Sequence, residues 1–452
     1  MAELLEQVGD WASQLRRGAL PASVRHHACR AVVDWFAATV PGGVMPPARI
    51  LREALAEAAT GAGAVLIPGG EPVPARTAAL INGTAAHTAE LDDIFRDGIY
   101  HPGAPTIAAA LAVGQQLGRT GAELLTAIVV GFELGTRVAA AIQPAHYRYW
   151  HTTGTVGTLG AAAAVASLLR LDPGQFAHAV STSVTMAAGL QQAFRSDAMS
   201  KPLHAGHAAE AGTLAALAAG RGFTGATGML EGPAGFGAAM SNGPDWTGVF
   251  DDLGSVYHIT EMTFKNHACC GHAFAPIDAA VQVREEVGID PERLVRAEVA
   301  TYRTALEVAG NPQPATEFEA KFSIPYCVAA ALRLGSVRLA AFTDANLTDP
   351  RLRELSRRVV LSVDPELDRE FPRRRGARVR FVLDDGSSHE VYRPTRKGDP
   401  DAPLSDQELT DKYTELVSPH LGEGPTALLG QLLWALDEVD DVRALLPGPG
   451  QS

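Results

Sequence analysis

Cysteine is scarce in this sequence, and basic residues do not outnumber acidic ones. The four cysteines, Cys29, Cys269, Cys270 and Cys327, are too few and too scattered for a disulfide framework, so we expect a reducing, cytoplasmic setting. Lys and Arg number 38 against 51 Asp and Glu, a formal net charge of −13. A field of this sign repels phosphate backbones and anionic membranes, which argues against nucleic acid as a partner. An anionic substrate would therefore need a local cluster of basic side chains and backbone N–H donors.

Long uninterrupted hydrophobic runs are also missing. Residues 156–169 are too few to span a bilayer, and residues 122–142 are interrupted by Glu123, Glu133 and Arg137. The first fifteen residues are amphipathic and acidic and lack the basic start and apolar run of a signal peptide. The sequence thus predicts a protein that is not exported and has no membrane partner.

The pattern of the chain predicts two parts of different class. Ala and Leu recur at helical spacing from residue 21 to about 220, with helix-start signals at Pro21, Thr120 and Asp172. Alternating β-branched residues follow in 294–302 and 357–363, and two further runs flank Asp384-Asp385-Gly386, which is typical of a hairpin. A capping-box pattern at Ser405 opens a last helical segment. We predict a mainly α protein, with a large all-helical domain formed by 1–264 and completed by 405–452, and a smaller α+β domain formed by 265–404.

The first segment that could carry chemistry contains His87, Glu90, Asp92, Asp93 and His101, all within fifteen residues. Acid and imidazole groups this close can act as general acid and base, since proton transfer needs a partner within hydrogen-bond reach. The alternative is that the acidic pair is an exposed cap and that the His-Pro step is only a turn.

The second segment begins at His151 and continues as a Gly- and Thr-rich helix entry. Such an entry exposes backbone N–H groups at the positive end of a helix dipole, which suits a carboxylate or a phosphate. The glycines do not follow a predicted strand, so a dinucleotide-binding fingerprint fits poorly. Close helix packing explains them nearly as well.

In the third segment, Lys201 precedes a proline at a helix entry, with His204 and His207 just beyond. A lysine in this position can hold a carboxylate, or act as a base if burial lowers its pKa. The two histidines, three residues apart, resemble part of a metal site, but a third ligand is missing nearby. We therefore expect no metal here.

The fourth segment brings together Lys265, His267, Cys269, Cys270 and His272. Adjacent cysteines without a second Cys-x-x-Cys make a zinc knuckle a weak interpretation, and a reactive thiolate is a further alternative. We interpret the segment as a wall of the substrate site, with Cys270 and His272 among the substrate-binding residues.

Taken together, the segments resemble the MmgE/PrpD family. The resemblance is carried, in family order, by AAHTAELDD with HPGAP, WHTTGTVGTLGAAAA, KPLHAGHAAEAG, FEAKFSIPY and DAPLSDQELTDKY, which span most of the chain. It implies a helical domain with an α+β lid, a homodimer, and a cleft between domains that handles small di- or tricarboxylates. It also implies that neither a metal nor an organic cofactor takes part.

The family's functional positions are matched here by His151, Lys201, His101 and Lys265. The resemblance implies that the two lysines bind carboxylate and that the two histidines serve as acid and base. We expect Asp93 to orient one imidazole. Which histidine is the base stays open at this point.

Three positions depart from the family's decarboxylase pattern: Glu90 replaces an aspartate, Ile94 a threonine and Cys270 a histidine. Arg195 and Tyr149, or Tyr147, are further candidate carboxylate contacts. The three departures argue against decarboxylation, and because dehydration is the broadest activity of the family, the resemblance favours a cofactor-independent lyase of the 2-methylcitrate dehydratase type. An epimerase of the iminodisuccinate type comes next, followed by a cis-aconitate-type decarboxylase and a catalytically silent binding protein.

Overall fold

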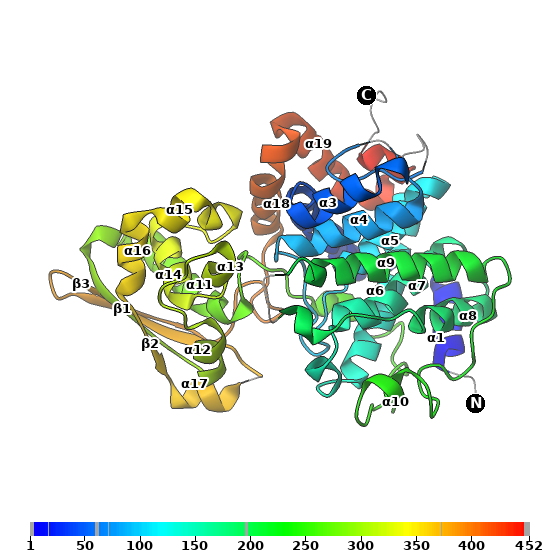
Figure 1. The fold of residues 1–452 in the computed structure, drawn as a ribbon, viewed down its shortest axis with the longest axis horizontal. Helices are drawn as coiled ribbons and strands as arrows, with labels where there is room; N and C mark the ends of the chain where they lie inside the picture. The colour runs from blue at the N-terminus through cyan, green and yellow to red at the C-terminus, as the bar shows by residue number, and fades with distance from the viewer. Residues whose placement is uncertain are drawn as a thin grey trace. The chain divides into compact units, whose positions relative to one another are not determined.

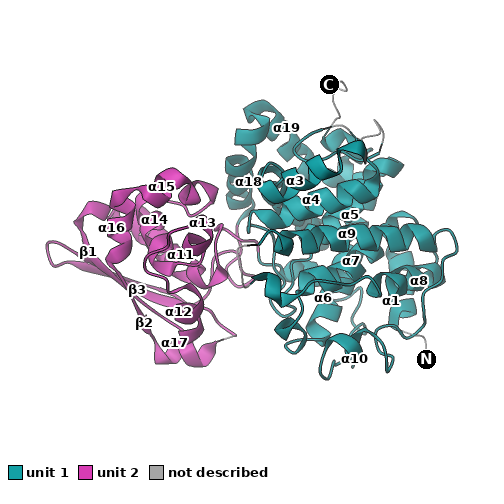
Figure 2. Cartoon of the chain, viewed as in Figure 1, with its two compact units in different colours: residues 1–263, 405–452 teal, residues 264–404 magenta. Residues whose placement is uncertain are grey.

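The chain divides into two compact units. The computed structural model describes residues 4–16, 18–58, 63–70, 72–194, 198–371 and 373–446. The larger unit comprises residues 1–263 and 405–452, and the smaller unit comprises residues 264–404 (Figure 2). The sequence places the corresponding boundaries at 264/265 and 404/405.

The described residues of the larger unit form helices and isolated β-bridges but no strand. Its helices are α1 (Leu4–Leu15), α2 (Ala22–Gly42), α3 (Pro46–Ala54), α4 (Ala75–Thr88), α5 (Gly103–Leu117), α6 (Gly121–Ala141), α7 (Thr152–Leu168), α8 (Pro173–Val184), α9 (Ser200–Ala219), α10 (Phe236–Met240), α18 (Asp406–Leu421) and α19 (Glu423–Trp434). The smaller unit carries α11 (Phe274–Val287), α12 (Arg303–Ala309), α13 (Glu317–Lys321), α14 (Ile324–Leu334), α15 (Asp344–Thr348), α16 (Pro350–Arg357) and α17 (Pro365–Glu370).

Local capping chemistry starts several of these helices where the sequence predicts. The side chains of Thr120, Asp172 and Ser405 each accept a hydrogen bond from the backbone N–H three residues further along the chain. The Glu or Gln at that third position accepts, through its side chain, a hydrogen bond from the backbone N–H of the capping residue. These reciprocal bonds satisfy two N–H groups that a helix end otherwise leaves without a partner. The predicted starts of α6, α8 and α18 are therefore confirmed.

The core of the larger unit is built from helices that approach closely. α4, α5, α7 and α9 pack against one another (Figure 1), and every residue of α7 is buried. Gly83 of α4 meets Gly206 of α9, where a Cβ on Gly206 would lie 2.2 Å from the carbonyl oxygen of Leu80. Only glycine allows this approach, so the small residues fix where the ends of α4 and α9 lie.

The smaller unit is built on a four-stranded sheet in the order β2-β1-β3-β4. β1 (Leu294–Thr301) runs parallel to β2 (Val359–Val363) and antiparallel to β3 (Ala377–Leu383). β3 and β4 (Ser388–Arg393) form the hairpin predicted at the Asp-Asp-Gly turn, where Gly386 has a φ of 81°. A mainly α protein with a smaller α+β part is confirmed.

One helix in the described part of the chain, α6, is long and apolar enough to cross a membrane by length and composition alone. Of its most apolar window, 83% is buried inside the protein, and Glu133 and Arg137 form an ion pair within it. Packing against the other helices of the larger unit accounts for its apolar character.

Candidate functional site

The larger unit gathers imidazole, carboxylate and ammonium groups at the ends of its packed helices. His87 lies in the last turn of α4, His151 is the residue that precedes α7, and Lys201 and His204 lie in the first turns of α9. His101 precedes α5, and its backbone N–H donates to Thr153 in the first turn of α7 at 3.3 Å. The crossing of α4 and α9 thus brings together residues more than a hundred positions apart.

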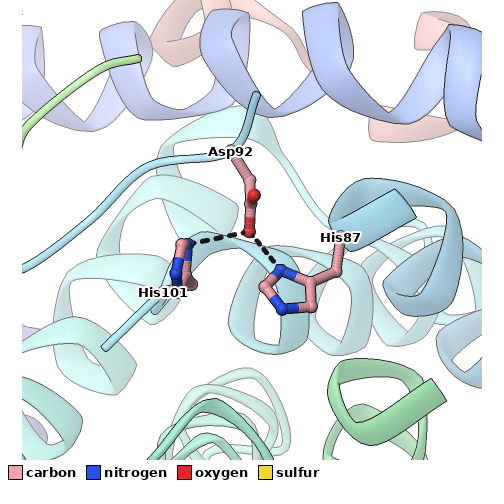
Figure 3. A group of neighbouring side chains, drawn as sticks. All are labelled: His87, Asp92 and His101. Carbon is pink, nitrogen blue, oxygen red and sulfur yellow. Dashed lines mark hydrogen bonds and ion pairs between the residues drawn. The ribbon is translucent and has the colours of Figure 1, made fainter. Parts of the chain in front are cut away.

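Asp92 lies between two of these imidazoles. Its Oδ2 atom is 2.6 Å from His87 Nδ1 and 3.2 Å from His101 Nδ1, and Figure 3 shows the carboxylate directed at both rings. Burial alone would raise the pKa of Asp92, but the adjacent His87 and His101 outweigh it and hold that pKa well below its usual range. An ionised Asp92 accepts the hydrogen of His87 Nδ1 and lies within ion-pair distance of His101 Nδ1, where it stabilises a protonated His101 ring.

His151 lies in the same cluster. Its ring stacks on that of His87 at a centroid distance of 5.3 Å, and its Nδ1 atom is 3.1 Å from Nδ1 of His204. Burial, followed by the charges of His87 and Lys201, holds the pKa of His151 well below 6.5. Burial and neighbouring cationic groups likewise lower the pKa of His204 to about 4. Both rings are therefore neutral near pH 7, and one donates its Nδ1 hydrogen to the other.

Lys201 is paired with Glu90. The ammonium group hydrogen-bonds the Glu90 carboxylate and lies 5.1 Å above the ring of Phe194, which also contacts His151 edge-on at 4.7 Å. Glu90 follows the end of α4 with a φ of 58°, in the left-handed region that non-glycine residues seldom occupy. This backbone conformation places the carboxylate against α9.

Asp93 does not hold the place that the sequence predicts for it. The carboxylate that contacts imidazoles is that of Asp92, whereas Asp93 Oδ1 accepts the backbone N–H of Gly103 at 3.0 Å. Burial, together with the nearby carboxylates of Asp34 and Asp92, raises the pKa of Asp93 well above its usual range. Consecutive residues in this loop point in different directions, so the acidic pair divides between the site and the start of α5.

Tyr149, a further predicted contact, lies at the surface of the larger unit. The Tyr149 side chain is 60% exposed, and the guanidinium of Arg148 lies 5.1 Å from the centre of its ring. Arg195 lies outside the described residues.

The smaller unit holds the remaining predicted residues. Lys265 is buried, and Cys270 is half-buried. The backbone N–H of Cys270 donates to the backbone carbonyl of Lys321 at 2.8 Å. His272 Nδ1 lies 2.7 Å from the hydroxyl of Tyr302. Burial, followed by nearby arginines, lowers the pKa of His272 to about 3, so its ring is neutral and able to donate a hydrogen bond. Burial also raises the pKa of Cys269, which disfavours a reactive thiolate there.

A metal ion has one candidate place among the described residues. One donor atom each of His87, Asp92 and His101 lies within 4.8 Å of the others. A cation there would displace the hydrogen that Asp92 accepts from His87, so it would disrupt the contacts of Asp92 with the two imidazoles. His204 and His207, the pair with metal-like spacing, face His151 and the carbonyl of Met186 instead.

Three side chains of the cluster are given no role in the site by the sequence analysis. His87 and Asp92 stand out only as members of an acidic and imidazole-rich segment, and His204 only through its spacing to His207. The i, i+5 spacing of His87 and Asp92 across a helix end is a signal that could have suggested their contact. The pairing of His204 with His151 joins positions 53 residues apart, and nothing local indicates it.

The fold and the cluster define a mainly helical protein of two units, with a cluster of imidazole, carboxylate and ammonium groups in the larger one. The chain belongs to the MmgE/PrpD family: residues 6–248 match the MmgE/PrpD N-terminal domain and residues 267–437 match the MmgE/PrpD C-terminal domain. Among curated proteins it is 27% identical to a cis-aconitate decarboxylase of Aspergillus terreus, over 97% of this chain and 94% of that protein. It is 28% identical to the cis-aconitate decarboxylase of Mus musculus, over 83% of this chain and 79% of that protein. The family resemblance noted in the sequence is thereby confirmed.

Proposed function

We propose that this protein is a cofactor-independent lyase that removes a proton beside a carboxylate of a small di- or tricarboxylic acid, and that it is a hydro-lyase. The observation that carries the proposal is the placement of a buried, neutral imidazole, His151, in one cluster with the ammonium group of Lys201 and the carboxylate-bound imidazole of His101. A poised base, an acid and a cation are what such a reaction needs.

In this proposal His151 is the base. Its low pKa keeps the ring unprotonated at neutral pH, and the bond to His204 fixes which nitrogen carries hydrogen. His151 takes the proton from the carbon beside the carboxylate, and the electron pair of that C–H bond moves into an enediolate. Lys201 stabilises the negative charge that develops on the carboxylate oxygens.

His101 is the acid, because the adjacent Asp92 carboxylate stabilises an imidazolium. As the enediolate collapses, a carbon–carbon double bond forms and the neighbouring carbon–oxygen bond breaks. His101 gives its proton to the departing hydroxyl, which leaves as water. In a hydro-lyase the two histidines thus exchange protonation states in one turnover.

The names of the relatives favour a second candidate, decarboxylation of a substrate such as cis-aconitate. Loss of CO2 from the substrate would leave the same kind of carbanion, which Lys201 would stabilise and a histidine would protonate at carbon. The two reactions share the cation and the acid, and only the bond that breaks differs.

Proton NMR in D2O with purified protein tests both candidates. The panel contains citrate, 2-methylcitrate, hydroxysuccinate, cis-aconitate and iminosuccinate. His151→Gln and Lys201→Ala are the site variants, and His178→Gln is the matched control, because the His178 ring bonds the Gly225 carbonyl and lies outside the cluster.

Loss of water from a hydroxy acid, abolished by the site variants and kept by the control, is the expected result. Loss of CO2 from cis-aconitate would replace the hydro-lyase by the decarboxylase. Deuterium exchange at a stereocentre without loss of mass would indicate an epimerase, and no turnover on the whole panel would overturn the proposal.

A further inference from the structure

The smaller unit contains an arginine, Arg375, whose positive charge no described residue balances. Its guanidinium forms neither an ion pair nor a hydrogen bond with any residue that the structure describes, and the residue is half-buried. Burial, followed by the charge of Arg396, lowers the pKa of Arg375, but a guanidinium stays protonated in proteins. A half-buried charge without a counter-charge is unfavourable, so an anionic ligand would stabilise it.

Phe371 is the common neighbour of Arg375 and of two polar side chains, His272 and Tyr302. The guanidinium carbon of Arg375 lies 5.8 Å from the centre of the Phe371 ring. The Tyr302 ring stacks on the same ring at a centroid distance of 4.6 Å, and the His272 ring lies 6.2 Å from it. Arg375 is therefore held near both side chains, and its charge acts on each of them.

His272 and Tyr302 together keep one hydrogen for a ligand. Burial raises the pKa of Tyr302, so its hydroxyl is protonated, and the neutral His272 ring carries one N–H group. The 2.7 Å contact between His272 Nδ1 and the Tyr302 hydroxyl uses one of these two hydrogens, whichever group donates. Neither side chain makes another hydrogen bond within the described part of the chain, so the second hydrogen is available.

The other arginine nearby, Arg396, already has an anion. Its Nε and Nη2 atoms donate to the Asp399 carboxylate at 3.0 and 2.8 Å, and its side chain is buried. This bidentate pair balances the charge of Arg396. Arg375 is thus the member of the group whose charge is left over, and the group as a whole suits one singly charged anion.

We propose that Arg375, together with the His272–Tyr302 pair, forms a carboxylate-binding site of the smaller unit. The planar guanidinium offers two parallel N–H donors, which match the two oxygens of a carboxylate, and the pair adds its remaining hydrogen. This inference rests on the proposed function only in that small carboxylic acids are taken to be the ligands. It does not depend on which bond the enzyme breaks.

Sequence reasoning includes His272 among the substrate-binding candidates but neither Arg375 nor Tyr302. Arg375 also lies outside the sequence segments that carry the family resemblance. Its place beside His272 follows from the stacking of Phe371 on Tyr302, which joins residues 69 positions apart.

Isothermal titration calorimetry with non-reacting acids tests the inference. The probes are succinate and propane-1,2,3-tricarboxylate, which have no hydroxyl group to lose, and inorganic phosphate as a second oxyanion. Loss of a charge-assisted, bidentate contact in Arg375→Gln should weaken the binding of at least one of the two acids by about 10- to 100-fold. Arg375→Lys keeps the charge but not the fork of donors, so its loss should be smaller.

Two further variants define the site and its control. Tyr302→Phe keeps the stacking on Phe371 but removes one hydrogen-bonding group, and it should weaken binding by about 3- to 10-fold. Arg374→Gln is the matched control, because Arg374 is the adjacent arginine and pairs with Glu370 at 3.7 Å at the surface. It should leave the affinity unchanged. The melting temperature of each variant shows whether it is folded.

The number of acid molecules bound to the unsubstituted protein distinguishes two sources of the carboxylate. One equivalent, weakened in Arg375→Gln, indicates a carboxylate of the substrate itself. Two equivalents, one of which is lost in Arg375→Gln, indicate a separate carboxylic acid. Either result supports the proposed site.

Affinities for both acids that stay within about threefold in Arg375→Gln and Arg375→Lys would overturn the inference, as would an equal loss in Arg374→Gln. Binding of phosphate without binding of either acid would overturn the assignment of a carboxylate. The NMR panel decides the reaction separately: binding that depends on Arg375 but without turnover would refute the lyase and leave this site, whereas turnover with binding independent of Arg375 would do the reverse.

Discussion

Asp92 and Asp93 are neighbours in sequence with opposite electrostatic states, and this contrast supports a sharp prediction. Asp92 is held ionised by two imidazoles, whereas the pKa of Asp93 is raised by burial and by other carboxylates. Replacing each by asparagine removes a charge in the first case and imitates a neutral acid in the second. We therefore expect Asp92→Asn to impair catalysis strongly and Asp93→Asn to have little effect on it.

The magnitude for Asp92→Asn follows from its two contacts, at 2.6 Å to His87 and 3.2 Å to His101. A hydrogen bond to a charged group contributes about 1.5 to 3 kcal/mol. An asparagine oxygen can keep one of them, but the loss of charge leaves His101 without the group that stabilises its protonated form. General acid–base catalysis contributes about 10²- to 10⁴-fold, so kcat/KM should fall by a factor in that range, or about 3 to 5 kcal/mol of barrier.

Asp93→Asn preserves the acceptor of the Gly103 N–H, which is 3.0 Å from Asp93 Oδ1. The amide has nearly the shape of the protonated carboxyl group that the raised pKa favours. We expect kcat/KM within about threefold of the unsubstituted protein, since the change touches no group that exchanges a proton with substrate. The melting temperature of both variants shows whether folding is retained.

Steady-state kinetics on the acid identified by NMR measures the two effects. A second readout, independent of turnover, is the proton NMR signal of imidazole N–H groups, in which Asp92→Asn should shift the His87 and His101 resonances and Asp93→Asn should not. Equal losses of kcat/KM in the two variants, or an Asp92→Asn enzyme that retains more than a tenth of its activity, would refute this account of the acidic pair.

Three further predictions concern stability. Lys412→Met should lower the free energy of unfolding by about 3 to 5 kcal/mol in urea titrations, because it leaves the buried Asp34 carboxylate without the ammonium group now 2.6 Å away. Gly206→Ala should lower the free energy of unfolding by about 1 to 3 kcal/mol, because a Cβ there would lie 2.2 Å from a carbonyl oxygen of α4. Gly424→Ala is the control and should leave the stability unchanged, because the space at its Cβ is open. Calorimetry compares the two variants. Burial lowers the pKa of His146 from 6.5 to about 4. The neutral His146 ring therefore stabilises the folded state fully above pH 6.5, and this stabilisation is lost as the pH falls towards 4. His146→Gln should therefore flatten the fall in stability over that range by up to about 1.4 kcal/mol per pH unit, measured by urea unfolding.

The parts of the fold that the sequence predicts are those governed by local chemistry. Capping boxes at Thr120, Asp172 and Ser405 determine helix starts through bonds that span three residues. The hairpin follows from a turn whose Gly386 takes a positive φ between alternating runs. Such signals operate within a few residues, so no knowledge of the rest of the fold is needed to interpret them.

The site is less predictable because its contacts depend on directions and distances that the sequence does not contain. The family pattern identifies His151, Lys201 and His101 as candidates, and the structure brings their segments together in the larger unit. Which carboxylate of an acidic pair faces an imidazole depends on the backbone dihedrals of the loop, and there Asp92 takes the place predicted for Asp93. The exposure of Tyr149 likewise follows from tertiary packing and not from its neighbours in the chain.

The Ala- and Gly-rich composition of the larger unit, which the sequence indicates only as a sign of close helix packing, also underlies the chemistry. The contact of Gly83 with Gly206 places the last turn of α4 beside α9, and hence Glu90, just past that end, within reach of Lys201. A larger residue at the crossing would separate the helices and break the ion pair before any site residue had changed. If this reasoning holds, Gly206→Ala should lower both the stability and kcat/KM on the acid identified by NMR, whereas Glu90→Gln should lower kcat/KM alone.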